Sequence, residues 1–415
     1  MLKKKLFLLC PLLLALSSAG CWNRLEPENY AWLTWVGLDQ VAGGKIQANM
    51  VITPPLSPVP TGAAPPEKLL TLSSATGDTL FDAVREINAH VPKRLFWPYL
   101  QAVIIGEDLA RTGVEQHLDV LFRNIRVRKN AWVFVTRGPT DPIFHVDPRI
   151  ETNPAKLTDS LVKAEKGFLG KSRVIRLKDF QTELASPGVD PVVSVLGVWD
   201  TRNKKLLSPG AEAPPESELA LNGSAVFRGD KLVGWLTPEE SQSYLLAKGE
   251  MKSGLITIPH PDNPQNLAGI ELISSRSKLA AQLSGDQPQA QIKIDISGKL
   301  GDQWLPAPAQ KTLQPEEDQE FYRQLADGLA QKVKAGVEEL LAKSQTEFGA
   351  DILGVGDYIM NRYPNDWDAV AENWRAHYRK TAFTVEVKVK ITSPNIMHSR
   401  PPAWSETGEP AQDGQ

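Results

Sequence analysis

The segment QIKIDIS, Gln291–Ser297, alternates isoleucine with polar residues. A second segment, AFTVEVKVKIT, Ala382–Thr392, keeps a similar alternation along its whole length. A β-strand turns successive side chains to opposite faces, so a period of two is typical of a strand with one buried and one solvated face. The two segments therefore predict half-buried strands of an antiparallel sheet in the C-terminal part of the chain.

The residues between these two strands predict the longest helix of the chain, from about Glu316 to Phe348. Its apolar residues recur at steps of three and four, which places them on one stripe of a helix. The stripe contains Phe321, Leu325, Leu329, Val333, Val337, Leu340, Leu341 and Phe348. A helix that binds a membrane or a partner would show the same stripe. We favour the simpler interpretation, in which the amphipathic helix packs across the two strands.

The chain before residue 206 alternates predicted strands and helices. Trp32–Gln40 and the segment after the Gly43-Gly44 turn predict two paired strands. Asp78 is the expected N-cap of a helix whose apolar face includes Phe81. Buried strands are also expected in YLQAVIIGEDLA and AWVFVTRG. This alternation predicts an α+β class, with two to three mixed α/β domains.

Composition shifts suggest where these domains begin and end. LLSPGAEAPPES, Leu206–Ser217, is rich in proline and is the best candidate for a linker. We expect a signal segment at 1–20, an N-terminal α+β domain at 21–206, a linker at 207–217 and a C-terminal α+β domain at 218–397. A further division near residue 285 is the alternative for the last domain. The polar residues 398–415 predict a disordered tail.

The first twenty residues have the order of a secretory signal, with Lys3, Lys4 and Lys5 before an apolar run and small residues after it. The apolar run Leu6–Leu16 is too short to span a bilayer, which needs about 20 residues. Cys21 follows at once, and SAGC is similar to the lipobox of bacterial lipoproteins, although Ser18 stands where leucine is usual. The sequence thus predicts removal of residues 1–20 and a covalent lipid on Cys21.

The number of cysteines and the net charge exclude several classes of function. The chain has two cysteines, and removal of the signal would remove Cys10, so Cys21 would have no disulfide partner and could belong to no cysteine-based metal site. Loss of three lysines would change the formal charge from −3 to −6. A mildly acidic chain without a basic tail is not typical of a nucleic-acid binder. Apart from the lipid, no cofactor is expected.

No catalytic constellation or metal-binding pattern emerges from the motifs. The six histidines are scattered, and the chain has no G-x-S-x-G elbow. EKGFLGKS ends like a phosphate-binding loop, but Glu165 stands where its first glycine should be. GVGD, Gly354–Asp357, is better explained as a tight turn between helices.

The densest basic stretch is RNIRVRKN, Arg123–Asn130. In a tethered protein its side chains are candidates for contact with an anionic membrane or a partner. Attraction to an anionic membrane contributes about 1 kcal/mol of binding free energy for each basic residue near the surface. The alternative, which we prefer, is a solvated helix end. The four residues concerned are Arg123, Arg126, Arg128 and Lys129.

Several segments, in order, resemble the Ger(x)C lipoproteins, the C subunits of spore germinant receptors. CWNRLE shares Cys21, Trp22, Arg24 and Glu26 with the family pattern, while Asn23 replaces the usual aspartate. GSAVFRGDKLVGWLTPEESQSYLLAKGEMKSG is the closest match, and it includes Thr237 and Glu240, a predicted capping box. VGLD, IRVRKNAWVFVTRG and DILGVGDYIMNRYPNDWDAVAENW also match.

The resemblance implies a non-catalytic α+β protein, anchored by lipid on the outer face of the spore inner membrane. It also implies assembly with two integral-membrane subunits, one of them transporter-like, in a receptor needed for germination. A solute-binding lipoprotein of an importer is the alternative function. Such a protein would need two similar lobes around a cleft, and the sequence shows no such repeat.

Overall fold

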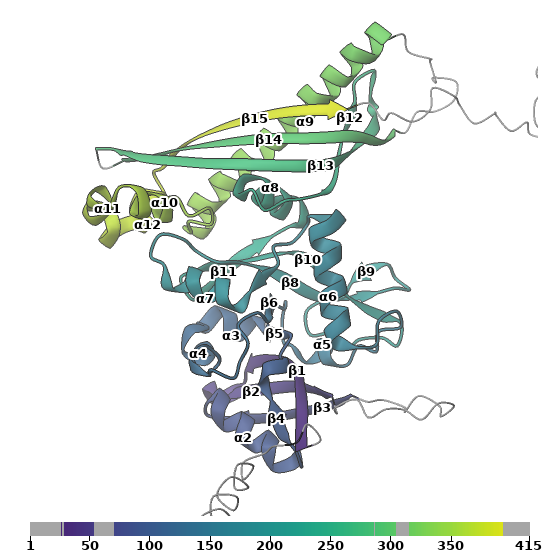
Figure 1. Cartoon of the computed structure of the whole chain (residues 1–415), viewed down its shortest axis with the longest axis vertical. Helices are drawn as coiled ribbons and strands as arrows, with labels where there is room; N and C mark the ends of the chain where they lie inside the picture. Colours follow the sequence, from purple (N-terminus) through teal and green to yellow (C-terminus); the bar gives the residue numbers. More distant parts are fainter. Residues whose placement is uncertain (1–25, 27–28, 54–69, 286, 304–314, 393–415) are drawn as a thin grey trace, which may run out of the picture.

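The computed structural model describes residues 26, 29–53, 70–285, 287–303 and 315–392 (Figure 1). Its described residues form two β-sheets with helices packed on them, so the predicted α+β class is confirmed. The predicted signal segment, Cys21 and the predicted tail from residue 398 lie outside the described residues.

The larger sheet follows the order β11-β10-β8-β6-β5-β1-β2-β3, with β4, β7 and β9 paired beside it. Its strands are β1 (Tyr30–Gln40), β2 (Ile46–Thr53), β3 (Thr71–Gly77), β4 (Arg94–Phe96), β5 (Ala102–Ile105), β6 (Trp132–Val135), β7 (Ile175–Arg176), β8 (Val192–Asp200), β9 (Lys205–Leu206), β10 (Ser217–Arg228) and β11 (Lys231–Leu236). Its helices are α2 (Leu80–His90), α3 (Glu107–Thr112), α4 (Glu115–Arg123), α5 (Asp141–Phe144), α6 (Pro154–Ala164) and α7 (Leu177–Ala185).

Two hydrophobic cores cover the two faces of this sheet. Helices α2, α3, α4 and α7 contribute to one core, and α5 and α6 to the other. Strands β1, β5 and β6 run parallel in the middle, and every residue of β5 and β6 is buried. Parallel strands covered on both faces are typically continuous apolar runs, as AVII and WVFV are here.

The smaller sheet has the order β12-β13-β14-β15, and the long helix lies along it (Figure 1). Its elements are α8 (Pro238–Lys248), β12 (Gly254–His260), β13 (Asn263–Ser284), β14 (Gln287–Gln303), α9 (Pro315–Lys343), α10 (Val355–Arg362), α11 (Pro364–Val370), α12 (Trp374–Tyr378) and β15 (Ala382–Thr392). Ile292, Ile294 and Ile296 are buried with the apolar stripe of α9. The predicted packing of helix on sheet is confirmed.

The last strand of the smaller sheet runs parallel to its neighbour, while the other strands pair antiparallel as predicted. Strands β12, β13 and β14 pair antiparallel, whereas β15 joins β14 in parallel register, with Ile292 opposite Val385. A parallel return needs a long crossover connection, and α9 to α12 provide it. Among the described helices, none is long and apolar enough to cross a bilayer.

Local details differ at two predicted positions. Asp78 does not cap α2; Thr79 does, because its side chain accepts a hydrogen bond from the Asp82 N–H at 3.2 Å. Phe81 lies outside the buried face of α2 and is 53% exposed, with the Arg85 guanidinium 4.9 Å from its ring centroid. Of the segment 207–217, residues 207–216 lie between β9 and β10, whereas Ser217 begins β10 and pairs with Asp200 of β8, so the larger sheet continues across the segment. The domain boundaries stay a prediction.

Candidate functional site

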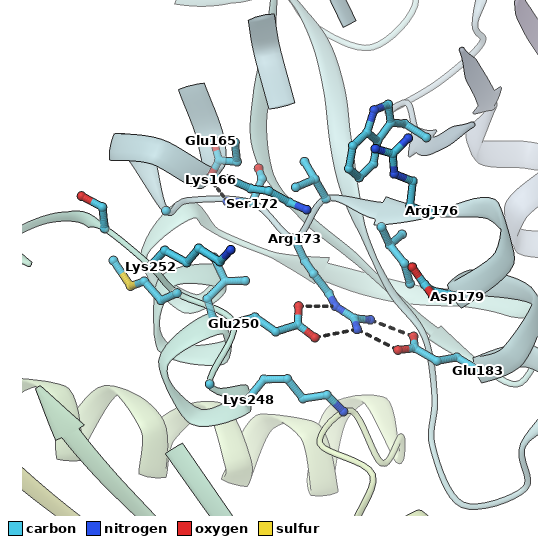
Figure 2. Close-up of a pocket in the computed structure, with 18 of the residues that line it drawn as sticks. Glu165, Lys166, Ser172, Arg173, Arg176, Asp179, Glu183, Lys248, Glu250 and Lys252 are labelled. Atoms are coloured by element: carbon cyan, nitrogen blue, oxygen red, sulfur yellow. Dashed lines mark hydrogen bonds and ion pairs between the residues drawn. The ribbon is translucent and has the colours of Figure 1, made fainter. Parts of the chain in front are cut away.

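A cavity of about 650 Å³ lies between the segment that leads into α7 and the turn that follows α8 (Figure 2). Its first wall runs from Glu165 to Glu183, and its second from Leu245 to Ser253. The first wall belongs to the larger sheet with its helices, while the second leads into β12 of the smaller sheet. The cavity therefore marks the junction between the two parts of the fold.

Helix α8 places the second wall. Thr237 and Glu240 form the predicted capping box at its start, and Gly249 ends it with a left-handed conformation, φ 75°. The Gly249 N–H and the next two N–H groups bond back to carbonyls of the last turn. Such a glycine cap reverses the chain sharply. The capped end fixes Lys248 and Glu250 on either side of the turn.

Arg173 is the centre of the cavity floor, and it is 5% exposed. Its guanidinium donates to both carboxylate oxygens of Glu183 at 2.7 Å each, and to both of Glu250 at 2.9 and 3.0 Å. It also donates to the Val192 carbonyl at 3.3 Å. Figure 2 shows the two carboxylates approaching the guanidinium from opposite sides. Because Glu183 lies on α7 and Glu250 follows α8, this triad, the Arg173 clamp, joins the two walls.

The charges of the clamp depend on one another. Burial opposes the charge of Arg173, yet the surrounding groups, the two carboxylates among them, raise its pKa. Burial likewise opposes the charge of Glu250, but the Arg173 guanidinium lowers the pKa of that carboxyl overall. Buried ion pairs are stable only when both partners and their hydrogen bonds are present. The clamp therefore acts as one unit.

Glu165 closes the loop that resembles a phosphate-binding motif. Its Oε1 accepts the N–H groups of Lys171 and Ser172, the latter at 2.5 Å, while its buried Oε2 has no protein partner. Burial raises the pKa of Glu165. A phosphate-binding loop must offer its N–H groups to the ligand. Here the Glu165 side chain already binds two of the N–H groups of the loop. They are therefore not available to a phosphate, as the missing glycine in the motif also indicates.

Two cations and one indole ring form the rim of the first wall. The Arg176 guanidinium stacks 3.5 Å from the Trp132 ring centroid, and the Lys166 ammonium lies 4.8 Å from it. Burial lowers the pKa of Lys166, and repulsion from Arg176 and Lys252 lowers it further. The rim is therefore locally cationic, whereas the floor beneath it is an internally paired ion cluster. One guanidinium that binds two carboxylates from different elements is the arrangement of a structural clamp.

A second junction lies near the cavity, between the segment before β8 and the segment before α10. The Asp351 N–H donates to an Asp190 carboxylate oxygen at 2.8 Å, and the Asp190 N–H returns a bond to the Asp351 carbonyl at 2.8 Å. The Asp351 carboxylate accepts N–H groups of the next turn and the Trp374 indole N–H. Within the described residues, no group of His, Cys, Asp or Glu side chains could hold a metal ion.

The two glycines of GVGD serve this junction in different ways. Gly354 precedes α10 with φ 77°, as the predicted turn requires. Gly356 lies inside α10, where an added Cβ would come 2.6 Å from Trp374 Nε1 and 2.8 Å from Gly188 Cα. The interpretation as a tight turn therefore holds for Gly354, while Gly356 allows close packing of two segments.

We expect protonation of Asp351 to stabilise the fold. Burial raises the pKa of its carboxyl to about 6, despite the donors around it. A raised folded-state pKa means that this contribution is full below about pH 4 and is lost as the pH rises through 6, a change of about 3 kcal/mol. Urea unfolding of the wild type and of Asp351→Asn at pH 5 and 7 measures the part of this change that falls between the two pH values, about 1.3 kcal/mol. Equal pH dependence in the two proteins would contradict the assignment.

The structure places the predicted basic residues on and after the end of α4. Arg123 is exposed and pairs with Asp119 at 2.7 Å, and Arg126 and Arg128 are exposed in the following loop. Lys129 is half-buried, and its ammonium donates to the Phe122 carbonyl and, at 3.3 Å, to Gln181. The loop does not reach the cavity lining. Its role in contacts stays a prediction.

Sequence reasoning did not identify the Arg173 clamp. Arg173 and Glu250 are 77 positions apart in the chain, and neither stands in a motif with a recognisable spacing. Glu183 lies on a helix with other charged residues, where a solvated face is the usual explanation. Only the fold brings the three side chains together.

Two family models match consecutive parts of the chain. The N-terminal domain of spore germination proteins matches residues 23–198, and the C-terminal B3/GerAC-like domain matches residues 222–395. The match therefore spans nearly all of the chain, in the order that the family has.

Curated relatives and one solved structure agree with these matches. The putative spore germination protein YfkR of Bacillus subtilis (strain 168) is 24% identical, over 94% of this chain and 96% of the relative. Spore germination proteins KC and B3 of the same organism are 21% and 20% identical, and each alignment covers at least 91% of both chains. The crystal structure of the GerBC protein has the same fold, with a TM-score of 0.51 at 16% identity, covering 86% of this chain and 96% of that one.

Proposed function

This chain belongs to the GerAC/GerBC-like family of spore germination proteins, the C subunits of germinant receptors, and on that premise we propose that it is a lipid-anchored, non-catalytic receptor subunit. The observation that carries the proposal is the match of both family domains, in order, from residue 23 to residue 395. The relatives of similar length are spore germination proteins by name. We infer that this protein is likewise needed for germination.

The lipid anchor is proposed on Cys21. It would be the first residue after the signal segment and the one cysteine left in the mature chain. Each buried acyl CH₂ contributes about 0.8 kcal/mol, and two or more chains make an attachment stable. The anchor would hold the folded body on the outer face of the spore inner membrane.

The proposed partners are two integral-membrane subunits, one of them transporter-like. Tethering raises the effective concentration of the body near such partners, because association on one membrane becomes nearly intramolecular. The exposed Arg123, Arg126 and Arg128 are candidate contacts with the membrane or with these subunits. The Arg173 clamp supports this role, since a body that holds its two parts in a fixed relation can present one continuous surface.

The test is affinity capture from spore membranes solubilised in mild detergent, with the captured proteins identified by mass spectrometry. We expect a multi-spanning, transporter-like protein and a second integral-membrane protein. Capture of an ATP-driven importer, together with calorimetric binding of a small solute to the isolated body, would instead support the solute-binding alternative.

A further inference from the structure

An apolar surface with four aromatic rings lies on the larger sheet beside the point where the chain comes from Cys21. We call it the aromatic patch, and it consists of Tyr30 and Trp32 on β1, Leu72 on β3, Phe96 on β4, and Tyr99 in the turn after β4. The four aromatic side chains are half-buried, and Leu72 is 38% exposed. The patch is thus partly open to its surroundings.

The strand register places Tyr30, Trp32 and Phe96 on one face, and it places Leu72 on the same face two strands away, because Val51 of β2 pairs with both Leu72 and Trp35. Tyr30 lies opposite Arg94 and Trp32 opposite Phe96 in the parallel pair of β1 and β4. The residues between them, Ala31 and Leu95, turn to the other face and are buried in the core. The Tyr30 and Phe96 ring centroids are 5.2 Å apart, and those of Trp32 and Tyr99 are 4.8 Å apart. The rings therefore form a continuous surface.

Helices cover the same face farther along the strands. Trp35 donates from Nε1 to Thr158 Oγ1 of α6 at 2.8 Å and stacks edge-on against Phe144 of α5 at 6.3 Å. At the start of β1, Tyr30 and Trp32 are half-buried. A cluster of partly exposed aromatic side chains on one face is a candidate binding surface.

Basic residues border the patch. Lys93 and Arg94 are exposed immediately before Phe96. Strands β1, β4, β5 and β6 run parallel, so the loop that enters β6 lies at the same end of the sheet as the start of β1. That loop carries Arg126, Arg128 and Ile125, whose side chain is 97% exposed, and its Val127 is buried in the core on the opposite face of the sheet, so of the basic residues named only Lys93 and Arg94 border the patch itself. Aromatic side chains with nearby cations are characteristic of protein surfaces at a membrane interface.

The proposed anchor precedes this patch by few residues along the chain. Nine peptide units separate Cys21 from Tyr30, and at about 3.5 Å each they span at most about 32 Å. A lipid on Cys21 would thus hold the start of β1 near the bilayer. Resting on the proposed function, we propose that the aromatic patch lies on the anionic surface of the bilayer and sets the orientation of the body on the membrane.

The test uses the full lipidated protein on vesicles of phosphatidylglycerol and phosphatidylcholine that carry nitroxide labels at the depth of the headgroups. Leu72→Cys introduces a thiol for a fluorescent dye into the patch, while the thiol of Cys21 is blocked by its lipid. Leu267→Cys, exposed on β13, is the matched control. We expect quenching at position 72 to exceed quenching at position 267 by about twofold or more, because the patch contacts the interface.

A second pair of variants tests the bordering charges. Lys93→Glu with Arg94→Glu should reduce quenching at position 72, and Lys388→Glu with Lys390→Glu, exposed on β15, should not. Equal quenching at positions 72 and 267 on vesicles that retain the protein would overturn the proposal. The proposal would also be overturned if the dye at position 72 were quenched only on vesicles that contain the integral-membrane subunits as well. The patch would then bind protein rather than lipid.

The mass of the N-terminal peptide separates this proposal from the anchor. An unmodified Cys21 would contradict the anchor in the proposed function, whereas a lipidated Cys21 with an unquenched dye at position 72 would contradict only the orientation.

Discussion

Replacement of Arg173 by leucine is expected to lower the free energy of unfolding by about 3 kcal/mol, since it leaves the Glu183 carboxylate, whose side chain is only 14% exposed, without its partner. Glu250 adds less to this loss, because its side chain is 36% exposed and water can compensate its charge. The carboxylates of Glu183 and Glu250 would then face each other across the junction at which the guanidinium now binds all four of their oxygens. Urea unfolding, followed by circular dichroism, measures the loss.

Arg323→Leu is the matched control. Arg323 also contacts two carboxylates, Glu320 at 2.6 Å and Asp327 at 3.0 Å, but its side chain is 63% exposed. Exposed ion pairs contribute only about 0–1 kcal/mol. If Arg323→Leu cost as much as Arg173→Leu, burial would not be what makes the clamp important. Should Arg173→Leu fail to fold, Glu183→Gln offers a milder change at the same junction.

Replacement of Cys21 by alanine is expected to release most of the protein from the spore membrane fraction, at least about a tenfold loss, because the acyl chains supply the attachment. Fractionation followed by immunodetection measures it. We also expect the nutrient response of the spores to fall, because the body would no longer be concentrated beside its membrane partners.

Cys10→Ala is the control for this change. Cys10 lies in the segment that we expect to be removed, so its replacement should alter neither the membrane share nor the nutrient response. Retention of Cys21→Ala in the membrane with an intact nutrient response would show that the anchor is dispensable.

The elements of the C-terminal part were predictable because their signals are local. The alternation around Ile292 and the stripe through Leu325 and Leu329 each specify a buried face without reference to the rest of the chain. The parallel direction of β15 depends instead on where the connection from β14 ends, which no local pattern specifies. The error at Asp78 is a shift of one residue, since Thr79 beside it also belongs to the residue types that cap helices.

The candidate sites likewise differ in whether their sequence signal is local or depends on the whole fold. The prediction for Cys21 rests on a local signal, within a few adjacent residues, and it stays a prediction because Cys21 lies outside the described residues. The Arg173 clamp has no such signal, because two distant carboxylates meet the guanidinium only after both sheets have formed. The basic stretch was predictable as a charge cluster, but the sequence did not reveal that the ammonium of Lys129 folds back to the Phe122 carbonyl while Arg126 and Arg128 stay exposed.

The most direct measurement of the central claim is the affinity capture of this protein from spore membranes, with an untagged strain as the background. Recovery of a transporter-like membrane protein and a second integral-membrane subunit, both enriched over that background, is the result that we predict. Recovery of the intact, lipidated protein with no integral-membrane partner, or with an importer, would contradict its role as a receptor subunit.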